Sequence, residues 1–207
     1  MRLSVDSGAI EGDLVVPAGA RGVVVFAHGS GSSRHSARNK QVAAVLRDAG
    51  FGTLLFDLLT ASEEAIDERT RALRFDIDLL GERLVAVTDA LADQAGARNL
   101  PVGYFGASTG AAAALVAAAA RPAVRAVVSR GGRPDLAGDA LPRVASPVLL
   151  IVGSLDREVL ALNREAQARL RAPSELVIVP GATHLFEETG TLDEVARLAV
   201  RHFARYL

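Results

Sequence analysis

The sequence predicts an α/β fold, mainly because of the order of its apolar segments. Short runs rich in Val, Ile, Leu and Phe alternate with longer helix-like segments along the 207 residues. Most runs are continuously apolar, as expected of parallel strands that are buried on both faces. The chain is also of suitable length for one domain over residues 1–207, with 50% apolar and 23% charged residues. Together these observations predict a mostly parallel open sheet with helices on both faces.

Seven short apolar runs are predicted to be strands: residues 14–17, 22–28, 52–57, 102–107, 124–129, 147–153 and 175–181. The first of them precedes any helix, so we expect it to pair antiparallel at the edge of the sheet. Five longer segments are predicted to be helices: Ser36–Ala49, Phe75–Ala95, Thr109–Ala120, Val159–Arg171 and Leu192–Tyr206. The charge-rich segment 58–74 is interpreted as a solvated loop or short helix that could overhang a site.

The composition argues against several classes of function. The formal net charge is -1, so there is no basic field to attract nucleic acid or anionic membranes, and we expect neither as a partner. Cysteine is absent, which excludes disulfides, thiolate metal sites and a cysteine nucleophile. The sequence shows no signal-peptide pattern and no apolar stretch long enough to span a membrane. We therefore expect a cytoplasmic protein.

The sequence GASTG, residues 106–110, lies where a predicted strand ends and a predicted helix begins. This context is typical of a nucleophile elbow, here one that presents Ser108. Gly106 and Gly110 would leave room for the strained turn, and the helix N-terminus favours developing negative charge. The alternative is that Ser108 only caps the helix.

A glycine-rich stretch, HGSGSS at residues 28–33, follows another predicted strand. Its backbone N–H groups could point at an oxyanion. His28 is expected to brace this loop rather than to act as a base. Of the other histidines, His202 falls on the surface of a predicted helix, and His35 lies in a loop that precedes the serine.

An acid and a base should follow the nucleophile in chain order, each after a strand. Asp156 lies just beyond the sixth predicted strand, and His184 lies just beyond the seventh. His184 is the only histidine in the expected order on a loop after a strand. Asp135, which follows the fifth predicted strand, is the alternative acid.

With these motifs the chain resembles the α/β-hydrolase superfamily and, more narrowly, its dienelactone-hydrolase-like branch. The resemblance covers nearly the whole chain and rests on HGSGSS, GASTG, GSLD and GATH in that order. It implies an open sheet of about eight strands with the site at their carboxyl ends. Members of the superfamily commonly insert a lid after the strand that follows the elbow. Residues 129–147 are too few for one, so no lid domain is expected.

The resemblance also implies a reaction. Ser108 would be the nucleophile, Asp156 the acid and His184 the base of a serine hydrolase that cleaves small carboxylic esters through an acyl-enzyme intermediate. Dienelactone hydrolases proper use a cysteine, so serine favours ordinary ester hydrolysis over dienelactone. No metal or organic cofactor is required. Two alternatives remain: an acyltransferase or perhydrolase on the same triad, and a catalytically silent hydrolase fold that binds a ligand.

The oxyanion and the substrate would be bound by neighbouring loops. The resemblance implies the N–H groups of Ser30 and Thr109 as oxyanion donors, with Gly31 as the alternative to Ser30. Three arginines at the carboxyl ends of strands are either solvated charges or a pocket for a substrate carboxylate: Arg34, Arg130 and Arg133. Without a lid the site should be open and shallow, which favours short acyl chains.

Overall fold

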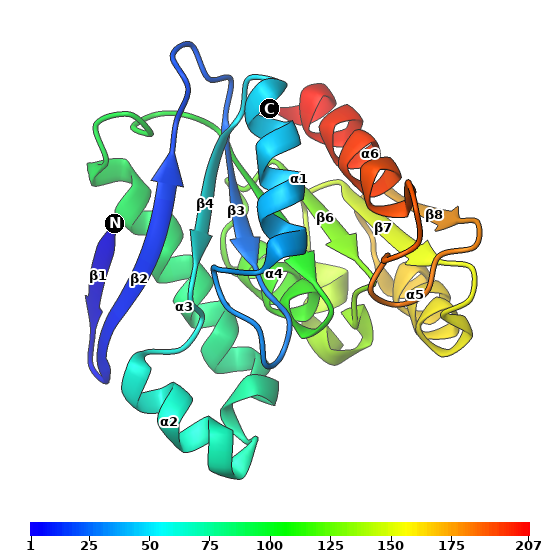
Figure 1. Ribbon diagram of the computed structural model, residues 1–207, viewed down its shortest axis with the longest axis horizontal. Helices are drawn as coiled ribbons and strands as arrows, with labels where there is room; N and C mark the ends of the chain where they lie inside the picture. Colours follow the sequence, from blue (N-terminus) through cyan, green and yellow to red (C-terminus); the bar gives the residue numbers. More distant parts are fainter.

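The computed structural model describes all 207 residues and contains one eight-stranded sheet. Its strands are β1 (Arg2–Val5), β2 (Gly8–Val15), β3 (Val23–Ala27), β4 (Gly52–Phe56), β5 (Val102–Ala107), β6 (Ala126–Arg130), β7 (Val148–Gly153) and β8 (Ser174–Val179). The spatial order is β1-β2-β4-β3-β5-β6-β7-β8, and only β1 and β2 run antiparallel to their neighbours (Figure 1). The predicted mostly parallel open sheet is confirmed.

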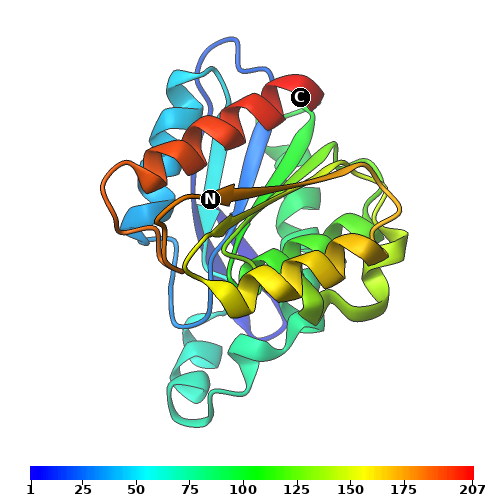
Figure 2. The ribbon, with the colours of Figure 1, turned by 90° about the vertical axis from the view of Figure 1, so that its right-hand side faces the viewer.

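Helices connect the strands and cover both faces, as predicted. They are α1 (Ala37–Asp48), α2 (Ala61–Thr70), α3 (Ile77–Ala90), α4 (Thr109–Ala120), α5 (Arg157–Arg169) and α6 (Thr191–Tyr206), with 3-10 helices η1 (Leu73–Phe75), η2 (Leu91–Asp93) and η3 (Pro134–Arg143). Helices α1 and α6 lie on one face, and α3, α4 and α5 lie on the other (Figure 2). None of these helices is both long and apolar enough to cross a membrane.

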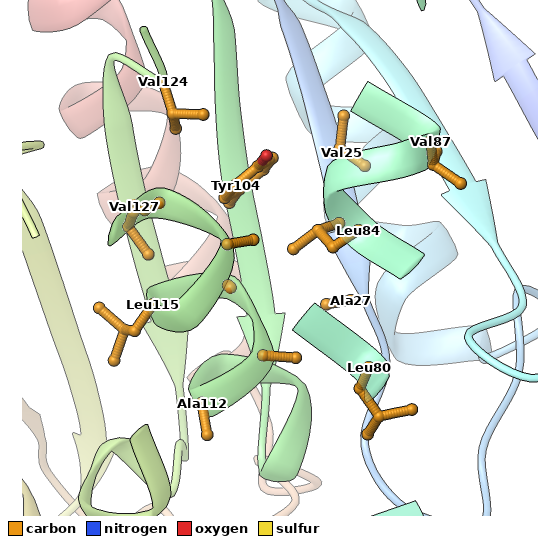
Figure 3. Packing of buried hydrophobic residues seen from close by; sticks show 14 of the residues in the cluster. Val25, Ala27, Leu80, Leu84, Val87, Tyr104, Ala112, Leu115, Val124 and Val127 are labelled. Carbon is orange, nitrogen blue, oxygen red and sulfur yellow. The ribbon is translucent and has the colours of Figure 1, made fainter. Parts of the chain in front are cut away.

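The core consists of two clusters, one on each face of the sheet. On the α3 and α4 side, Val25 and Tyr104 of the central strands pack with Leu84 and Leu115 (Figure 3). Eight of the twelve residues of α4 are alanine, and nearly the whole helix is buried. Small side chains allow this helix to lie close to the strands, which fixes the position of its first turn.

The first two strands form a hairpin that the apolar-run criterion misses. The strand predicted at residues 14–17 is in fact Gly8–Val15, and it pairs antiparallel with both β1 and β4. Ile10 is buried, whereas Glu11 and Asp13 are exposed. Such alternation is typical of antiparallel strands with one face in water. The antiparallel pairing is confirmed, but β1 rather than β2 forms the edge.

Other boundaries shift for local reasons. The helix predicted over Phe75–Ala95 begins at Ile77 and ends at Ala90, followed by the turn η2. The charge-rich segment 58–74 contains α2, which begins with a capping box between Thr60 and Glu63. Residues 129–147 contain η3, which packs against α4 and α5.

Candidate active site

Ser108 lies at a sharp turn between β5 and α4, with φ 51° and ψ -123°. Positive φ is uncommon for a residue with a side chain and is often found at functional sites. The Ser108 N–H donates to the Arg130 carbonyl (3.3 Å), and its own carbonyl accepts from the Arg133 N–H (3.0 Å). The side chain makes no capping hydrogen bond, so the interpretation of Ser108 as a simple helix cap is wrong.

The two glycines of the turn are required by close backbone contacts. A Cβ atom at Gly106 would lie 2.4 Å from the Ala111 Cα, and one at Gly110 would lie 2.3 Å from the Ala27 carbonyl oxygen. Both distances are far inside van der Waals contact. The turn therefore holds its strained conformation because the backbone of β3 and the first turn of α4 fit directly against it.

The structure brings the predicted acid and base together. His184, in the loop between β8 and α6, has its Nδ1 atom 2.6 Å from the Asp156 Oδ2 atom. The Asp156 side chain is 14% exposed and that of His184 is 38% exposed, so the pair opens to solvent on the histidine side. Asp135, the alternative acid, instead accepts two hydrogen bonds from Arg133 (2.9 and 2.8 Å).

The loop that follows β6 connects the serine to the histidine. The carbonyl of Arg130, the last residue of β6, accepts the Ser108 N–H, and the first residue of the loop, Gly131, lies against the histidine. A Cβ atom at Gly131 would be 3.0 Å from the His184 carbonyl oxygen and 3.6 Å from its Nδ1 atom. Ser108 and His184 make no direct hydrogen bond. Such contacts are often long in unliganded enzymes and tighten when substrate binds.

The glycine-rich loop runs directly past the serine. A Cβ atom at Gly29 would lie 3.1 Å from the Ser108 Cβ. The Ser30 N–H already donates to the Thr109 Oγ1 atom (2.9 Å), so it is not free to bind an oxyanion in this conformation. The Thr109 and Gly31 N–H groups make no such bond. This geometry favours the Gly31 N–H as an oxyanion donor, which is the alternative to Ser30 given in the sequence analysis.

His28 braces this loop, as predicted. Its Nδ1 atom donates to the Gly29 carbonyl (2.9 Å), and its Nε2 atom accepts from the Leu58 N–H (3.1 Å). Because Nε2 accepts a hydrogen bond, the ring must be neutral. Burial lowers the pKa of His28, although the Gly29 carbonyl and Asp57 act in the opposite direction.

Two of the three predicted substrate-binding arginines are neutralised within the protein. Arg34 donates from its backbone N–H (2.8 Å) and its guanidinium to Asp57, and Arg133 pairs with Asp135. Asp57 was not singled out from the sequence. Asp57 ends a predicted strand at the edge of the sheet where the other site loops begin, and this position is the sequence feature that indicates it lies near the site. Arg130 is not in a loop: it is the last residue of β6 and is buried.

The remaining histidines lie outside this cluster. His35 is exposed on the loop before α1. His202 is on α6, as predicted, but it is not a solvated surface residue: it is half-buried, and its Nε2 atom lies 3.3 Å from the Pro147 carbonyl at the amino end of β7. No group of three or more His, Cys, Asp or Glu side chains is arranged to hold a metal ion.

The segment 58–74 lies beside the glycine-rich loop. Asp67, which is 1% exposed, accepts hydrogen bonds from the backbone N–H (3.0 Å) and Nε (2.6 Å) of Arg74. The Arg74 Nη1 atom would be 3.3 Å from a Cβ atom at Gly31. The segment therefore packs against one side of the glycine-rich loop.

Ser108 and His184 line none of the five main cavities of the molecule. The largest of these, a cleft of about 560 Å³, lies along the glycine-rich loop and is bounded by β1, β2 and the start of α2. Polar and charged residue types predominate among its lining residues, which include Ser32, Arg34 and Asp57. Ser108 is thus partly exposed at the surface, and the 560 Å³ cleft lies along the neighbouring glycine-rich loop.

Comparison with known proteins identifies the family and supports the fold. Residues 10–207 match the dienelactone hydrolase family. The crystal structure of a dienelactone hydrolase from Anabaena variabilis is 59% identical with a TM-score of 0.97, and the match covers 100% of this chain and 96% of that one. An α/β serine hydrolase homologue from Coxiella burnetii is 20% identical with a TM-score of 0.80, covering 97% and 95% of the two chains. At that identity the likeness shows the fold alone.

Two longer relatives come from Mycobacterium tuberculosis strains CDC 1551 and H37Rv. Each is provisionally named a phosphoribosyl transferase and is 63% identical to this chain over 199 residues. The match covers 96% of this chain but only 44% of either relative. The chain therefore spans less than half the length of these curated relatives.

Proposed function

The chain belongs to the dienelactone hydrolase family, and from that premise we propose that it is a hydrolase that cleaves small carboxylic esters with Ser108 as nucleophile. One observation carries the proposal. The His184–Asp156 pair, joined at 2.6 Å, lies across Gly131 from a serine held at φ 51°. Nucleophile, base and orienting acid in one cluster are the requirements of acyl transfer through a covalent intermediate.

The proton transfers follow from the contacts of the histidine ring. Asp156 engages Nδ1, so Nε2 is the nitrogen left to remove the Ser108 proton as Oγ attacks the ester carbonyl. The same nitrogen then donates that proton to the departing alkoxide. Water repeats the sequence on the acyl-enzyme and releases the acid. Asp156 holds the ring in the required tautomer and stabilises its cation.

The negative charge that develops on the carbonyl oxygen needs donors beside Ser108. We assign this role to the Thr109 N–H, at the N-terminus of α4, and to the Gly31 N–H. The Thr109 hydroxyl holds the Ser30 N–H, so in this scheme it positions the loop instead of leaving that group to the substrate. Each oxyanion donor of this kind contributes about 3–4 kcal/mol to the transition state.

Serine in place of cysteine supports ordinary esters as substrates. Acyl transfer or perhydrolysis would use the same residues with a different acceptor, and a silent fold would use none of them. The name phosphoribosyl transferase belongs to proteins of which this chain spans 44%. We infer that the matching part is their hydrolase portion.

A fluorophosphonate probe tests the nucleophile directly. We expect the unmodified protein to be labelled once, at Ser108, and Ser108→Ala to resist labelling. The variant should lose about 10⁴-fold or more in kcat on p-nitrophenyl acetate while its Tm is kept. Ser62→Ala, which alters an exposed serine of α2, is the matched control. Labelling of Ser108→Ala equal to that of the control would refute the assignment.

The acid is tested by comparing two carboxylates. Asp156→Asn should lower kcat by up to about 10⁴-fold, because the ring then favours the wrong tautomer. Asp135→Asn leaves His184 untouched and disturbs only the pair with Arg133. Loss of activity in Asp135→Asn with retention in Asp156→Asn would show that the acid has been misassigned.

A further inference from the structure

Arg130 is a buried cation for which the protein supplies no counter-ion. It is 7% exposed, its Nε atom has no hydrogen-bond partner, and it takes part in no salt bridge. Burial, and then the charge of Arg38, lowers the pKa of Arg130 to about 10, so the group still carries its charge at neutral pH. The other two arginines at this edge, Arg34 and Arg133, each have a carboxylate.

A second positive group, Arg38, acts on Arg130 through its charge and borders the same Phe186 side chain. Arg38 belongs to the first turn of α1, a turn that contains no acidic residue, and its own Nε atom is buried without a partner. Its Nη1 atom contacts Glu187 at 3.1 Å, and that carboxylate is 65% exposed. Glu187 thus pairs with Arg38 and is well hydrated, so Arg130 and the positive end of α1 leave an excess of positive charge.

Packing on an aromatic ring does not compensate for this burial. The Arg130 Cζ atom lies 5.9 Å from the centroid of the Phe186 ring. A cation–π contact contributes about 0.5–2 kcal/mol, whereas taking an ion out of water costs several kcal/mol. The desolvation cost is the larger quantity. An anion that joins the guanidinium would reverse the balance.

We propose that Arg130, together with Arg38 at the start of α1, binds an oxyanion: a carboxylate or a phosphate group. The planar guanidinium matches either group with paired hydrogen bonds, and a helix N-terminus favours negative charge. The site adjoins the loop of His184, because Gly131 touches His184 and Phe186 is two residues beyond it.

The oxyanion has two sources that the chemistry at Arg130 does not distinguish. It is either an acid group on the ester substrate or a free ion. The first source rests on the proposed function, since the same molecule must react at Ser108. The second does not, and it can be measured without any turnover.

Binding of a free ion is tested by thermal unfolding in sodium phosphate or sodium acetate, against sodium chloride at equal ionic strength. Three proteins are compared with the unmodified chain: Arg130→Met, Arg38→Gln and Arg21→Met. Arg21 is the matched control, because it also lies over an aromatic ring, with its Cζ atom 4.5 Å from the centroid of Phe51, but is itself exposed. For a free ion, phosphate or acetate should raise Tm in the unmodified chain and in Arg21→Met, and less in the two test variants.

A substrate-borne acid group is tested by kcat/KM on a neutral ester and on its carboxylate-bearing analogue. Arg130→Met should lower the acidic-to-neutral ratio by at least about tenfold, the effect of losing one charge-assisted hydrogen bond. Arg38→Gln, altered at a partly exposed position, gives the same readout if Arg130→Met does not fold. The site is refuted if the unmodified chain and both test variants agree in the anion-dependent Tm and in the ester ratio. Absence of neutral-ester hydrolysis in the unmodified chain would refute the proposed function instead, and the Tm comparison would still decide the anion site.

Discussion

At the scale of single residues, the nucleophile turn depends on two positions without side chains. Gly110→Ala would place a Cβ atom 2.3 Å from the Ala27 carbonyl oxygen, so the backbone must shift. We expect a loss of at least about 1–3 kcal/mol in the free energy of unfolding and a Tm lower by several degrees. Gly96→Ala is the control, because its Cβ would meet Val16 at an ordinary 3.6 Å. Equal Tm values for the two variants would contradict this account of the turn.

His28 makes the stability of the fold depend on pH. In the unfolded chain, the pKa of this histidine is about 6.5. The folded chain resists protonation, because burial lowers the pKa of His28. Stability is therefore full above about pH 6.5 and falls as the pH drops toward the folded pKa, by at most about 1.4 kcal/mol per pH unit.

Urea unfolding at pH 7.5 and pH 5.5 measures this effect. The unmodified chain should lose more stability between these two values than His28→Gln, which has no ring to protonate. His35→Gln, altered on the exposed loop, should behave as the unmodified chain does. A His28→Gln variant with the same pH dependence as the unmodified chain would exclude His28 as the cause.

At the scale of elements, α2 is attached to the rest of the molecule mainly through polar contacts. Asp67→Asn would leave the Arg74 guanidinium, which is 20% exposed, without its carboxylate. Breaking a buried pair of this kind typically costs about 3–5 kcal/mol. The control is Asp139→Asn, whose carboxylate is 98% exposed and pairs with Arg169, where at most about 1 kcal/mol is expected. Denaturant unfolding that gives similar losses for both would show that Asp67 does not anchor α2.

The elements that the sequence predicted best are those for which burial on both faces leaves a continuous apolar run. Strands β3 to β7 and the alanine-rich helix α4 belong to this group. The other edge strand, β8, was also predicted from its apolar run, although it is only partly buried. Strand β1 was missed because its pattern is half polar, as an edge strand requires. The order of Ser108, Asp156 and His184 could be read from the chain, since each follows a strand. The hydrogen-bond partners of Arg34 and Ser30 could not be predicted, because they lie on other loops and the sequence does not show which side chains meet across two loops.

At the scale of the whole molecule, the open site predicts a preference for short acyl chains. Leu155 and Leu185, beside the acid and the base, are 57% and 38% exposed and offer a small apolar surface. A long chain would extend past them into water, and each methylene left there forgoes about 0.8 kcal/mol. On p-nitrophenyl esters from acetate to palmitate, kcat/KM should not rise toward the longest chain. Such a rise would indicate that α2 folds over the site.

The two ends of the chain lie at different places relative to Ser108 and to the edge of the sheet. Helix α6 carries Leu207 to the side of the sheet where the parallel strands begin, whereas Ser108 lies where they end (Figure 1). The amino group of Met1, in contrast, donates to the Gly12 carbonyl within the first hairpin. A purification tag or an immobilising support joined at the carboxyl terminus would therefore face away from incoming ester. The same attachment at the amino terminus would begin at a residue that is hydrogen-bonded into the edge of the sheet.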